Sequence, residues 1–163
     1  MPPIEPGKKA PAFTLKDQEG KTHKLTDYAG SPLILYFYPK DDTSGCTDQA
    51  CQFRDTLPRF NKLNAKVLGV SILDTKSKAK FAAKNDLNFP ILADDAENDE
   101  GKPDPKVAQK YGVWAEKSMY GRKYMGVERT TFLIGPDGKV AKRWDKVKVP
   151  GHAEEVLEAI KSL

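Results

Sequence analysis

The sequence is organised around residues 36–51, which read Tyr36-Phe37-Tyr38-Pro39-Lys40-Asp41-Asp42-Thr43-Ser44-Gly45-Cys46-Thr47-Asp48-Gln49-Ala50-Cys51. This stretch runs from an apolar strand through a polar turn into a helix, and it holds both cysteines of the chain. We expect Cys46 in the first turn of that helix, where unpaired backbone N–H groups and the helix dipole stabilise an anion. For a cysteine that anion is the reactive thiolate, so the stretch predicts a nucleophilic Cys46.

The segments around this stretch read as strands. Residues 32–38 and 66–73 are continuous apolar runs, which is typical of strands buried on both faces of a sheet. Residues 13–16 and 22–25 flank a polar turn and predict an N-terminal β-hairpin. We expect His23 on the exposed face of its hairpin strand.

Helical spacing continues downstream of Cys46. Apolar residues recur three and four positions apart along residues 50–60, and we expect Pro58 to kink this helix or to end its first segment. Further short helices are predicted at 76–85, 106–111 and 152–163. Residues 94–105, between two of these helices, are acidic and rich in Pro and Gly, which indicates an exposed loop.

The order of these elements indicates the fold class. A second hairpin is predicted from strands at 130–134 and 139–144, joined by Gly135-Pro136-Asp137-Gly138. A buried parallel pair with helical crossovers, followed by an antiparallel hairpin, favours a mixed central sheet with helices on both faces. We therefore expect an α/β protein with a thioredoxin-like fold, formed by one domain over residues 1–163.

Composition excludes several function classes. The 163 residues carry 27 basic and 23 acidic side chains, interleaved along the chain, for a net charge of +4, so we expect no nucleic-acid partner. No run of 18 apolar residues is present and the N-terminus has no apolar signal segment, which predicts a cytoplasmic protein without a membrane span. His23 and His152 lie far from the cysteines in sequence, so we expect no metal site.

Several motifs resemble the peroxiredoxin family. Pro39, Thr43 and Cys46 have the Pro-x3-Thr-x2-Cys spacing of that family, and a second cysteine at Cys51 resembles the peroxiredoxin Q, or bacterioferritin comigratory protein, subgroup. Ser44 stands where that subgroup commonly has proline. The resemblance continues to the C-terminus, through 111–114, 119–126 and 129–134.

The resemblance implies a mechanism and a site. Cys46 would be the peroxidatic cysteine and Cys51 the resolving one, while Thr43 and Arg129 would hold the peroxide and the thiolate, and Pro39 would shield the pocket. The family implies reduction of hydrogen peroxide or organic hydroperoxides, with no metal, haem or other cofactor, and electrons from thioredoxin or a similar dithiol. Because the candidate resolving cysteine is internal and no long C-terminal extension follows the last helix, we expect a monomer.

Thiolate supply alone does not explain an efficient peroxidase. A free cysteine, with a pKa of about 8.5, is only ~3% thiolate at neutral pH. Near-complete ionisation gives a ~30-fold gain, but intrinsic nucleophilicity falls with the pKa and removes about tenfold of it. The larger share should come from Thr43 and Arg129, since preorganised donors that stabilise developing charge are commonly worth about 10²–10³-fold each.

The spacing of the two cysteines predicts a conformational change. Residues five apart in an intact helix have Cα atoms about 8.5 Å apart. Disulfides seldom form when this separation exceeds ~7 Å. A Cys46–Cys51 bond therefore requires the first turns of the helix to unwind, so we expect separated sulfurs in the reduced state and a remodelled 45–51 segment in the oxidised one.

Other interpretations stay open at this point. A thioredoxin-like disulfide reductase is disfavoured by four residues between the cysteines instead of two, and a redox-regulated binding domain is a further alternative. Thr43 is also a plausible cap or turn residue, Arg129 a surface arginine and Pro39 a strand terminator. A buried apolar helix residue is the less favoured alternative for Cys51.

Overall fold

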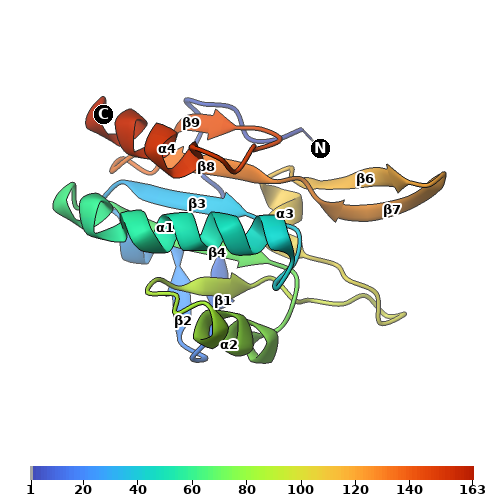
Figure 1. The fold of residues 1–163 in the computed structure, drawn as a ribbon. Coiled ribbons are helices and arrows are strands. Elements are labelled where there is room, and N and C mark those ends of the chain that lie inside the picture. Colours follow the sequence, from blue (N-terminus) through green and yellow to red (C-terminus); the bar gives the residue numbers. More distant parts are fainter. Residues whose placement is uncertain (1) are drawn as a thin grey trace.

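A seven-stranded sheet forms the centre of the computed structural model, which describes residues 2–163 (Figure 1). The strand order is β2-β1-β5-β4-β3-β8-β9. The strands of this sheet are β1 (Thr14–Lys16), β2 (Thr22–Lys24), β3 (Leu33–Phe37), β4 (Lys66–Ser71), β5 (Ile91–Ala93), β8 (Thr130–Ile134) and β9 (Val140–Trp144). The helices are α1 (Ser44–Lys62), α2 (Thr75–Lys84), α3 (Lys106–Lys110), α4 (His152–Lys161) and the 3-10 turn η1 (Leu25–Tyr28).

The sheet is mixed, as the sequence predicts. Strands β3, β4 and β5 are parallel to one another, whereas β8 pairs antiparallel with β3, and β1 pairs antiparallel with β5. All five residues of β3 are buried, because alternate side chains enter the apolar cores on the two faces of the sheet. The N-terminal hairpin, β1 with β2, forms one edge.

Helices cover both faces. Side chains of α1, α2 and α4 share one core with Tyr36, which stacks on Phe53 of α1 with ring centroids 4.6 Å apart. Residues of α3 belong to the core on the opposite face, together with Phe37 and Tyr111 (Figure 1). Together these observations confirm a thioredoxin-like α/β fold. Between residues 2 and 163, no helix has the length and apolarity needed to cross a membrane.

Of the two effects predicted for Pro58, a kink or an end to the first helical segment, the second is wrong. Helix α1 runs without interruption from Ser44 to Lys62. Proline lacks the N–H that would bond to the carbonyl of Arg54, four residues earlier. That carbonyl instead accepts a hydrogen bond from Nδ2 of Asn88 at 3.2 Å. The missing intrahelical bond is thus replaced from outside the helix.

The prediction of an exposed His23 is wrong. Its side chain is buried, with Nε2 2.7 Å from Oδ2 of Asp17 and Nδ1 2.6 Å from the hydroxyl of Tyr28. Burial raises the pKa of Asp17, but hydrogen bonds from His23 and from two backbone N–H groups outweigh it and leave this pKa below its usual value. Two polar partners therefore make the inward orientation of the ring favourable.

A second two-stranded sheet lies outside the main one. Strands β6 (Trp114–Met119) and β7 (Arg122–Val127) pair antiparallel and project from the body as an arm (Figure 1). We did not predict this hairpin, because most of its residues are polar or exposed and its strands present no continuous apolar face. Its turn residues Tyr120 and Gly121 both have positive φ, as expected for the tight turn of a two-residue hairpin.

The 94–105 segment is a loop, but its first residue is not exposed. Asp94 is buried and accepts hydrogen bonds from the backbone N–H groups of Val107 and Ala108. Its carboxylate thus caps α3, which has no cap of its own from Pro105. Burial raises the pKa of Asp94 despite these two donors. The remainder of the loop is mostly exposed.

Candidate active site

Cys46 lies in the first turn of α1, as its position after the polar turn predicts. Thr43 is the N-cap residue with an extended backbone, so Cys46 is the third helical residue. The first intrahelical bond within this turn runs from Thr47 N to Thr43 O, at 2.8 Å. The N–H groups before Thr47 have no such partner in the helix and give the turn its positive character.

Strand register brings Arg129 to this turn. In the antiparallel pair of β3 and β8, Phe37 at the end of β3 stands opposite Thr130 at the start of β8. Arg129 precedes Thr130 by one residue, so it lies beside the loop that leads from β3 into α1. Two residues 83 positions apart thereby meet.

The guanidinium of Arg129 contacts two side chains of α1. Nη2 donates a hydrogen bond to Sγ of Cys46 at 3.3 Å, and Nη1 donates to Oε1 of Gln49 at 2.6 Å. A side chain at Gly45 would place Cβ 3.2 Å from Nη2, which is tighter than ordinary contact. Glycine at this position therefore leaves room for the guanidinium beside the sulfur.

Gln49 is a site residue that the sequence analysis did not identify. It is 1% exposed, and its Oε1 orients Arg129. Its Nε2 is buried with no hydrogen-bond partner among the described residues. Its position in the sequence could have indicated this role, because Gln49 follows Cys46 by three residues and therefore lies on the same face of the helix.

Cys46 is 1% exposed and packs in the core cluster that contains Tyr36 and Tyr38. Burial, followed by the charges of Cys46 and Asp41, holds the pKa of Tyr36 well above its usual value, so its hydroxyl stays protonated. Among the described side chains, Arg129 is the one that donates a hydrogen bond to the Cys46 sulfur. The structure thus places a fixed positive charge beside this sulfur.

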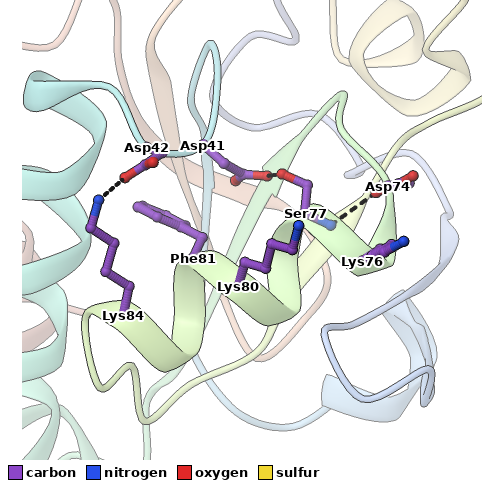
Figure 2. Close-up of a pocket in the computed structure, with 8 residues that line it drawn as sticks. All are labelled: Asp41, Asp42, Asp74, Lys76, Ser77, Lys80, Phe81 and Lys84. Carbon is purple, nitrogen blue, oxygen red and sulfur yellow. Dashed lines mark hydrogen bonds and ion pairs between the residues drawn. The ribbon is translucent and has the colours of Figure 1, made fainter.

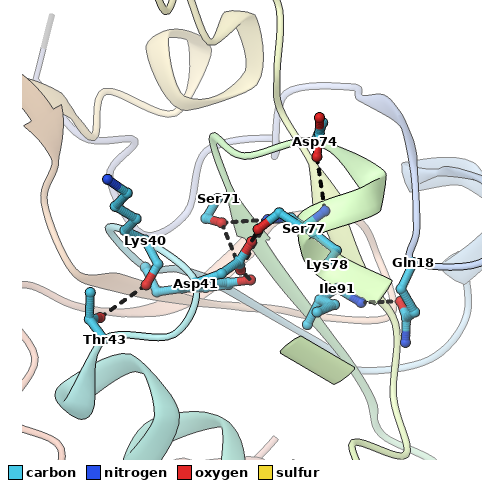
Figure 3. A network of polar contacts seen from close by, with 10 residues as sticks. Gln18, Lys40, Asp41, Thr43, Ser71, Asp74, Ser77, Lys78 and Ile91 are labelled. Atoms are coloured by element: carbon cyan, nitrogen blue, oxygen red, sulfur yellow. Dashed lines mark hydrogen bonds and ion pairs between the residues drawn. The ribbon is translucent and has the colours of Figure 1, made fainter. Parts of the chain in front are cut away.

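Thr43 and Pro39 lie on the loop before α1, but neither is hydrogen-bonded to the sulfur. The hydroxyl of Thr43 is exposed and donates to the carbonyl of Lys40 at 3.0 Å (Figure 3). Pro39 is half-buried, two residues beyond the last residue of β3. The structure thus brings Cys46 and Arg129 into contact and places Thr43 and Pro39 on the adjacent loop.

Cys51 is half-buried one and a half turns further along α1. Both cysteines are free thiols, and the helix between them is intact. Within residues 2–163, no three His, Cys, Asp or Glu side chains form a group that could hold a metal ion.

Known proteins are similar to this chain in sequence and in fold. A sequence model of the AhpC/TSA family matches residues 6–143. Peroxiredoxin Bcp of Bacillus subtilis (strain 168) is 44% identical over 160 residues, covering 98% of this chain and 97% of the relative. The chain belongs to the peroxiredoxins of this family. Within them it belongs to the Bcp, or peroxiredoxin Q, subgroup, as its motifs predict.

Solved structures support the assignment of this peroxiredoxin. Xanthomonas campestris peroxiredoxin Q is 40% identical, with a TM-score of 0.85 over 98% of both chains. A structure of the bacterioferritin comigratory protein from the same organism was described for its alkyl peroxide reduction activity. It is 40% identical, with a TM-score of 0.85 over 97% of this chain and 98% of that one. The chain is accordingly an enzyme of the thiol-peroxidase class.

Proposed function

We propose that the chain reduces hydrogen peroxide and organic hydroperoxides through Cys46. The observation that carries this proposal is the 3.3 Å contact between Arg129 Nη2 and Cys46 Sγ in the first turn of α1. The thiolate attacks one peroxide oxygen, the O–O bond breaks, and Cys46 becomes a sulfenic acid. The other oxygen leaves as water or an alcohol after taking up a proton.

The donors of Arg129 support stabilisation of the leaving oxygen. A guanidinium has five N–H donors, and the contacts with Cys46 and Gln49 account for two of them. The remaining hydrogens on the same two nitrogens are available to a peroxide beside the sulfur. Charge that develops on the leaving oxygen would be stabilised without reorganisation of the protein.

The role we propose for Thr43 differs from that of a donor. Its hydroxyl carries one hydrogen, which is donated to the Lys40 carbonyl. Its oxygen can therefore only accept, and we propose that it accepts the O–H of the bound peroxide. Pro39, with its fixed backbone and no N–H, shields the buried sulfur from water.

Cys51 completes the cycle in this proposal. Its thiol attacks the sulfenic sulfur of Cys46, water leaves, and an intramolecular disulfide forms. Because Cys46 and Cys51 are five positions apart in the helix, with Cα atoms about 8.5 Å apart, residues 44–51 must first unwind. Thioredoxin or a similar dithiol then reduces the disulfide and returns both thiols.

The related Xanthomonas campestris protein supports organic hydroperoxides as part of the substrate range. We also propose that the enzyme acts in the cytoplasm, without nucleic acid, and as a monomer because both reacting cysteines belong to one helix. Light scattering of the reduced protein should give the mass of one chain, 18.1 kDa. A stable dimer mass would refute the monomer.

Peroxide consumption by the reduced protein, with and without a dithiol regeneration system, tests the proposal. Cys46→Ser should abolish consumption, whereas Cys51→Ser should give one stoichiometric burst without dithiol-linked turnover. Arg129→Ala, which removes both the charge and the donors, should slow the burst by about 10³-fold. Turnover that survives in Cys46→Ser would overturn the assignment, and dithiol–disulfide exchange without any peroxide consumption would indicate a disulfide reductase instead.

A further inference from the structure

An ion pair is buried beneath the loop that precedes the catalytic helix. Lys78 of α2 and Asp41 of the loop have side chains that are 0% and 1% exposed. Lys78 Nζ donates to both carboxylate oxygens of Asp41, at 3.2 Å to Oδ1 and 3.1 Å to Oδ2 (Figure 3). Neither residue contacts the Cys46 sulfur by a hydrogen bond, so the pair lies outside the chemistry described above.

Neutral side chains form further hydrogen bonds with both charged groups. Asp41 Oδ1 accepts from the hydroxyl of Tyr38 at 2.5 Å, and Asp41 Oδ2 accepts from Oγ of Ser77 at 2.8 Å. Lys78 also donates to Oγ of Ser71 at 2.6 Å. A buried charge is tolerated when it is paired and hydrogen-bonded, and this network meets that requirement at both ends.

The network joins three elements to one loop. Tyr38 directly follows β3, Ser71 ends β4, and Ser77 and Lys78 belong to α2. Asp41 lies between Pro39 and Thr43, which are the two loop residues that the proposed mechanism uses. Beyond Asp41 the chain must turn sharply, and Asp42 has a positive φ of 64°. A carboxylate held on several sides at this point fixes where the loop enters α1.

Stability alone is a poor explanation for such a pair. Replacing a buried ion pair by apolar residues of similar volume is often neutral or stabilising. The best-supported use of a buried polar network is to select one geometry among several.

We propose that Asp41 and Lys78 are positioning residues, which hold loop 39–43 against Cys46 and keep it in place while residues 44–51 unwind. This inference rests on the proposed function of Cys46 and adds to it a fixed upstream boundary for the unwinding segment. The loop presents Thr43 to the peroxide in the reduced state. It also remains folded on β4 and α2 when the disulfide forms, so that the helix can wind again after reduction.

Single-turnover oxidation in a Cys51→Ser background tests the positioning role. Lys78→Met should slow formation of the Cys46 sulfenic acid by about tenfold or more, since a misplacement of about 1 Å can cost 10²-fold. Alkylation of Cys46 by iodoacetamide should keep its rate, because the sulfur and Arg129 are untouched. A merely structural role would leave the peroxide rate of the folded protein unchanged, or would lower both rates equally.

The same helix and loop offer a matched control. Lys84 of α2 pairs with Asp42 at 2.9 Å, but both side chains lie more than half exposed at a pocket of about 390 Å³ (Figure 2). Lys84→Met should leave the peroxide rate unchanged, as should Asp42→Asn, because asparagine tolerates positive φ. Asp41→Asn should reproduce the loss seen in Lys78→Met.

An unpaired buried charge could unfold the single variants, so the double variant Asp41→Asn/Lys78→Met is also needed. Removal of both charges should raise the melting temperature above that of either single variant, while the peroxide rate stays at least about tenfold low. A folded Lys78→Met or double variant that reacts with peroxide at the parent rate would overturn the inference. Failure of the parent itself to react with peroxide would instead refute the proposed function.

Hydrogen exchange of the oxidised two-cysteine protein tests the boundary separately. Exchange should rise across residues 44–51 and stay slow at Tyr38, whose N–H bonds to the carbonyl of Val70 at 3.0 Å. In the oxidised Lys78→Met variant, hydrogen exchange should rise both across residues 44–51 and at Tyr38. Increased exchange at Tyr38 in the oxidised parent would contradict a fixed boundary.

Discussion

Arg129 connects the start of β8 with the first turn of α1 through two hydrogen bonds from one side chain. Its contact with Cys46 places a positive charge beside the sulfur, and its contact with Gln49 holds the plane of the guanidinium. Planar, bidentate geometry of this kind distinguishes arginine from lysine, whose ammonium is a point charge on a flexible stem. We therefore predict that a positive charge alone is insufficient at this position.

Arg129→Lys tests that distinction at the level of one residue. Lysine keeps the charge beside Cys46 but loses the second nitrogen with its N–H donors. The rate constant for the reaction of Cys46 with peroxide should therefore fall by about 10²-fold. Stopped-flow oxidation of the reduced enzyme measures this rate. Arg122→Lys, on the exposed arm, is the control and should react normally. A normal rate for Arg129→Lys would show that charge suffices.

His152, at the start of α4, is buried, and its pKa is lowered by this burial and by the charge of Arg129. Its Nε2 lies 2.8 Å from Oγ1 of Thr131, and its ring packs edge-on against Phe53 and Trp144. Burial, with a smaller contribution from the charge of Arg129, lowers the pKa of His152 to about 4. The folded protein therefore holds this imidazole neutral at neutral pH.

The lowered pKa predicts an acid-sensitive fold. Between about pH 6.5 and pH 4 the unfolded chain binds a proton at His152 that the folded chain does not, so stability falls as pH falls through this window. At 1.36 kcal/mol per pKa unit, the loss is on the order of 3 kcal/mol below pH 4. Urea unfolding at several pH values measures it. His152→Gln should flatten this part of the profile, and an unchanged slope would exclude His152 as its source.

At the residue scale, the sequence predicted those site residues that belong to a recognisable motif. Cys46 and Arg129 were named from the sequence, and they meet in the structure. Gln49 and the buried position of His23 were missed. Both depend on partners distant in sequence: Arg129 for Gln49, and Asp17 with Tyr28 for His23. An isolated polar residue gives no sign that such partners exist.

At the element scale, the proposed mechanism places two requirements on helix α1. The helix must be formed in the reduced enzyme to hold Cys46 against Arg129, and in the proposed cycle its first turns must open for Cys51 to react. The structure has no side-chain hydrogen bond from the N-cap residue Thr43 to this helix. The first turn is therefore held mainly by Arg129 and by packing, which is compatible with reversible opening.

Ser44→Pro should shift this balance toward the closed helix. Proline is favoured at the first helical position, and Thr43, with φ −94° and ψ 153°, already has the backbone that precedes a proline. We expect the free energy of unfolding to rise by about 0.4–1 kcal/mol. Disulfide formation after sulfenic acid should slow by about two- to fivefold, if the same energy opposes unwinding.

Rapid-quench thiol counting measures the disulfide step, and Ser44→Ala is the control that removes the side chain without fixing φ. Ser44→Ala should form the disulfide at the parent rate. Equal rates for Ser44→Pro and the parent would mean that the first turn does not limit resolution.

At the element scale, periodicity predicted most helices and buried strands. It did not predict that helix α1 continues through Pro58, where a side chain from another segment replaces the missing hydrogen bond. It also failed at β6 and β7, because an exposed arm needs no apolar alternation. In both cases the structure depends on a contact with another segment, which the spacing of apolar residues within one segment does not reveal.

The whole molecule is held by one sheet between two apolar cores. The core of α1, α2 and α4 packs on one face, and the core of α3 and the N-terminal segment packs on the other. The class of this fold could be predicted from the order of elements. The position of β8 beside β3 could not, because strand order depends on which edges pack best after collapse.

We propose that the whole chain unfolds as a single domain, in one cooperative transition. Trp144 packs against one core and Trp114 against the other, so together they report on both faces. Fluorescence and far-UV circular dichroism should give the same urea midpoint. Trp114→Phe isolates Trp144 and should leave this midpoint coincident with the circular dichroism. Two separated midpoints would contradict a single domain.

The central claim is that Cys46 reacts with peroxide and Cys51 then reaches it by unwinding the helix that contains both. Intact mass and far-UV circular dichroism, recorded on the same reduced sample after one equivalent of peroxide, test it most directly. We predict a chain lighter by two hydrogen atoms, with a 46–51 disulfide in its peptide map and less helix than before. A chain that gains one oxygen atom and keeps the Cys51 thiol, or a proven 46–51 bond with unchanged helical content, would contradict the account.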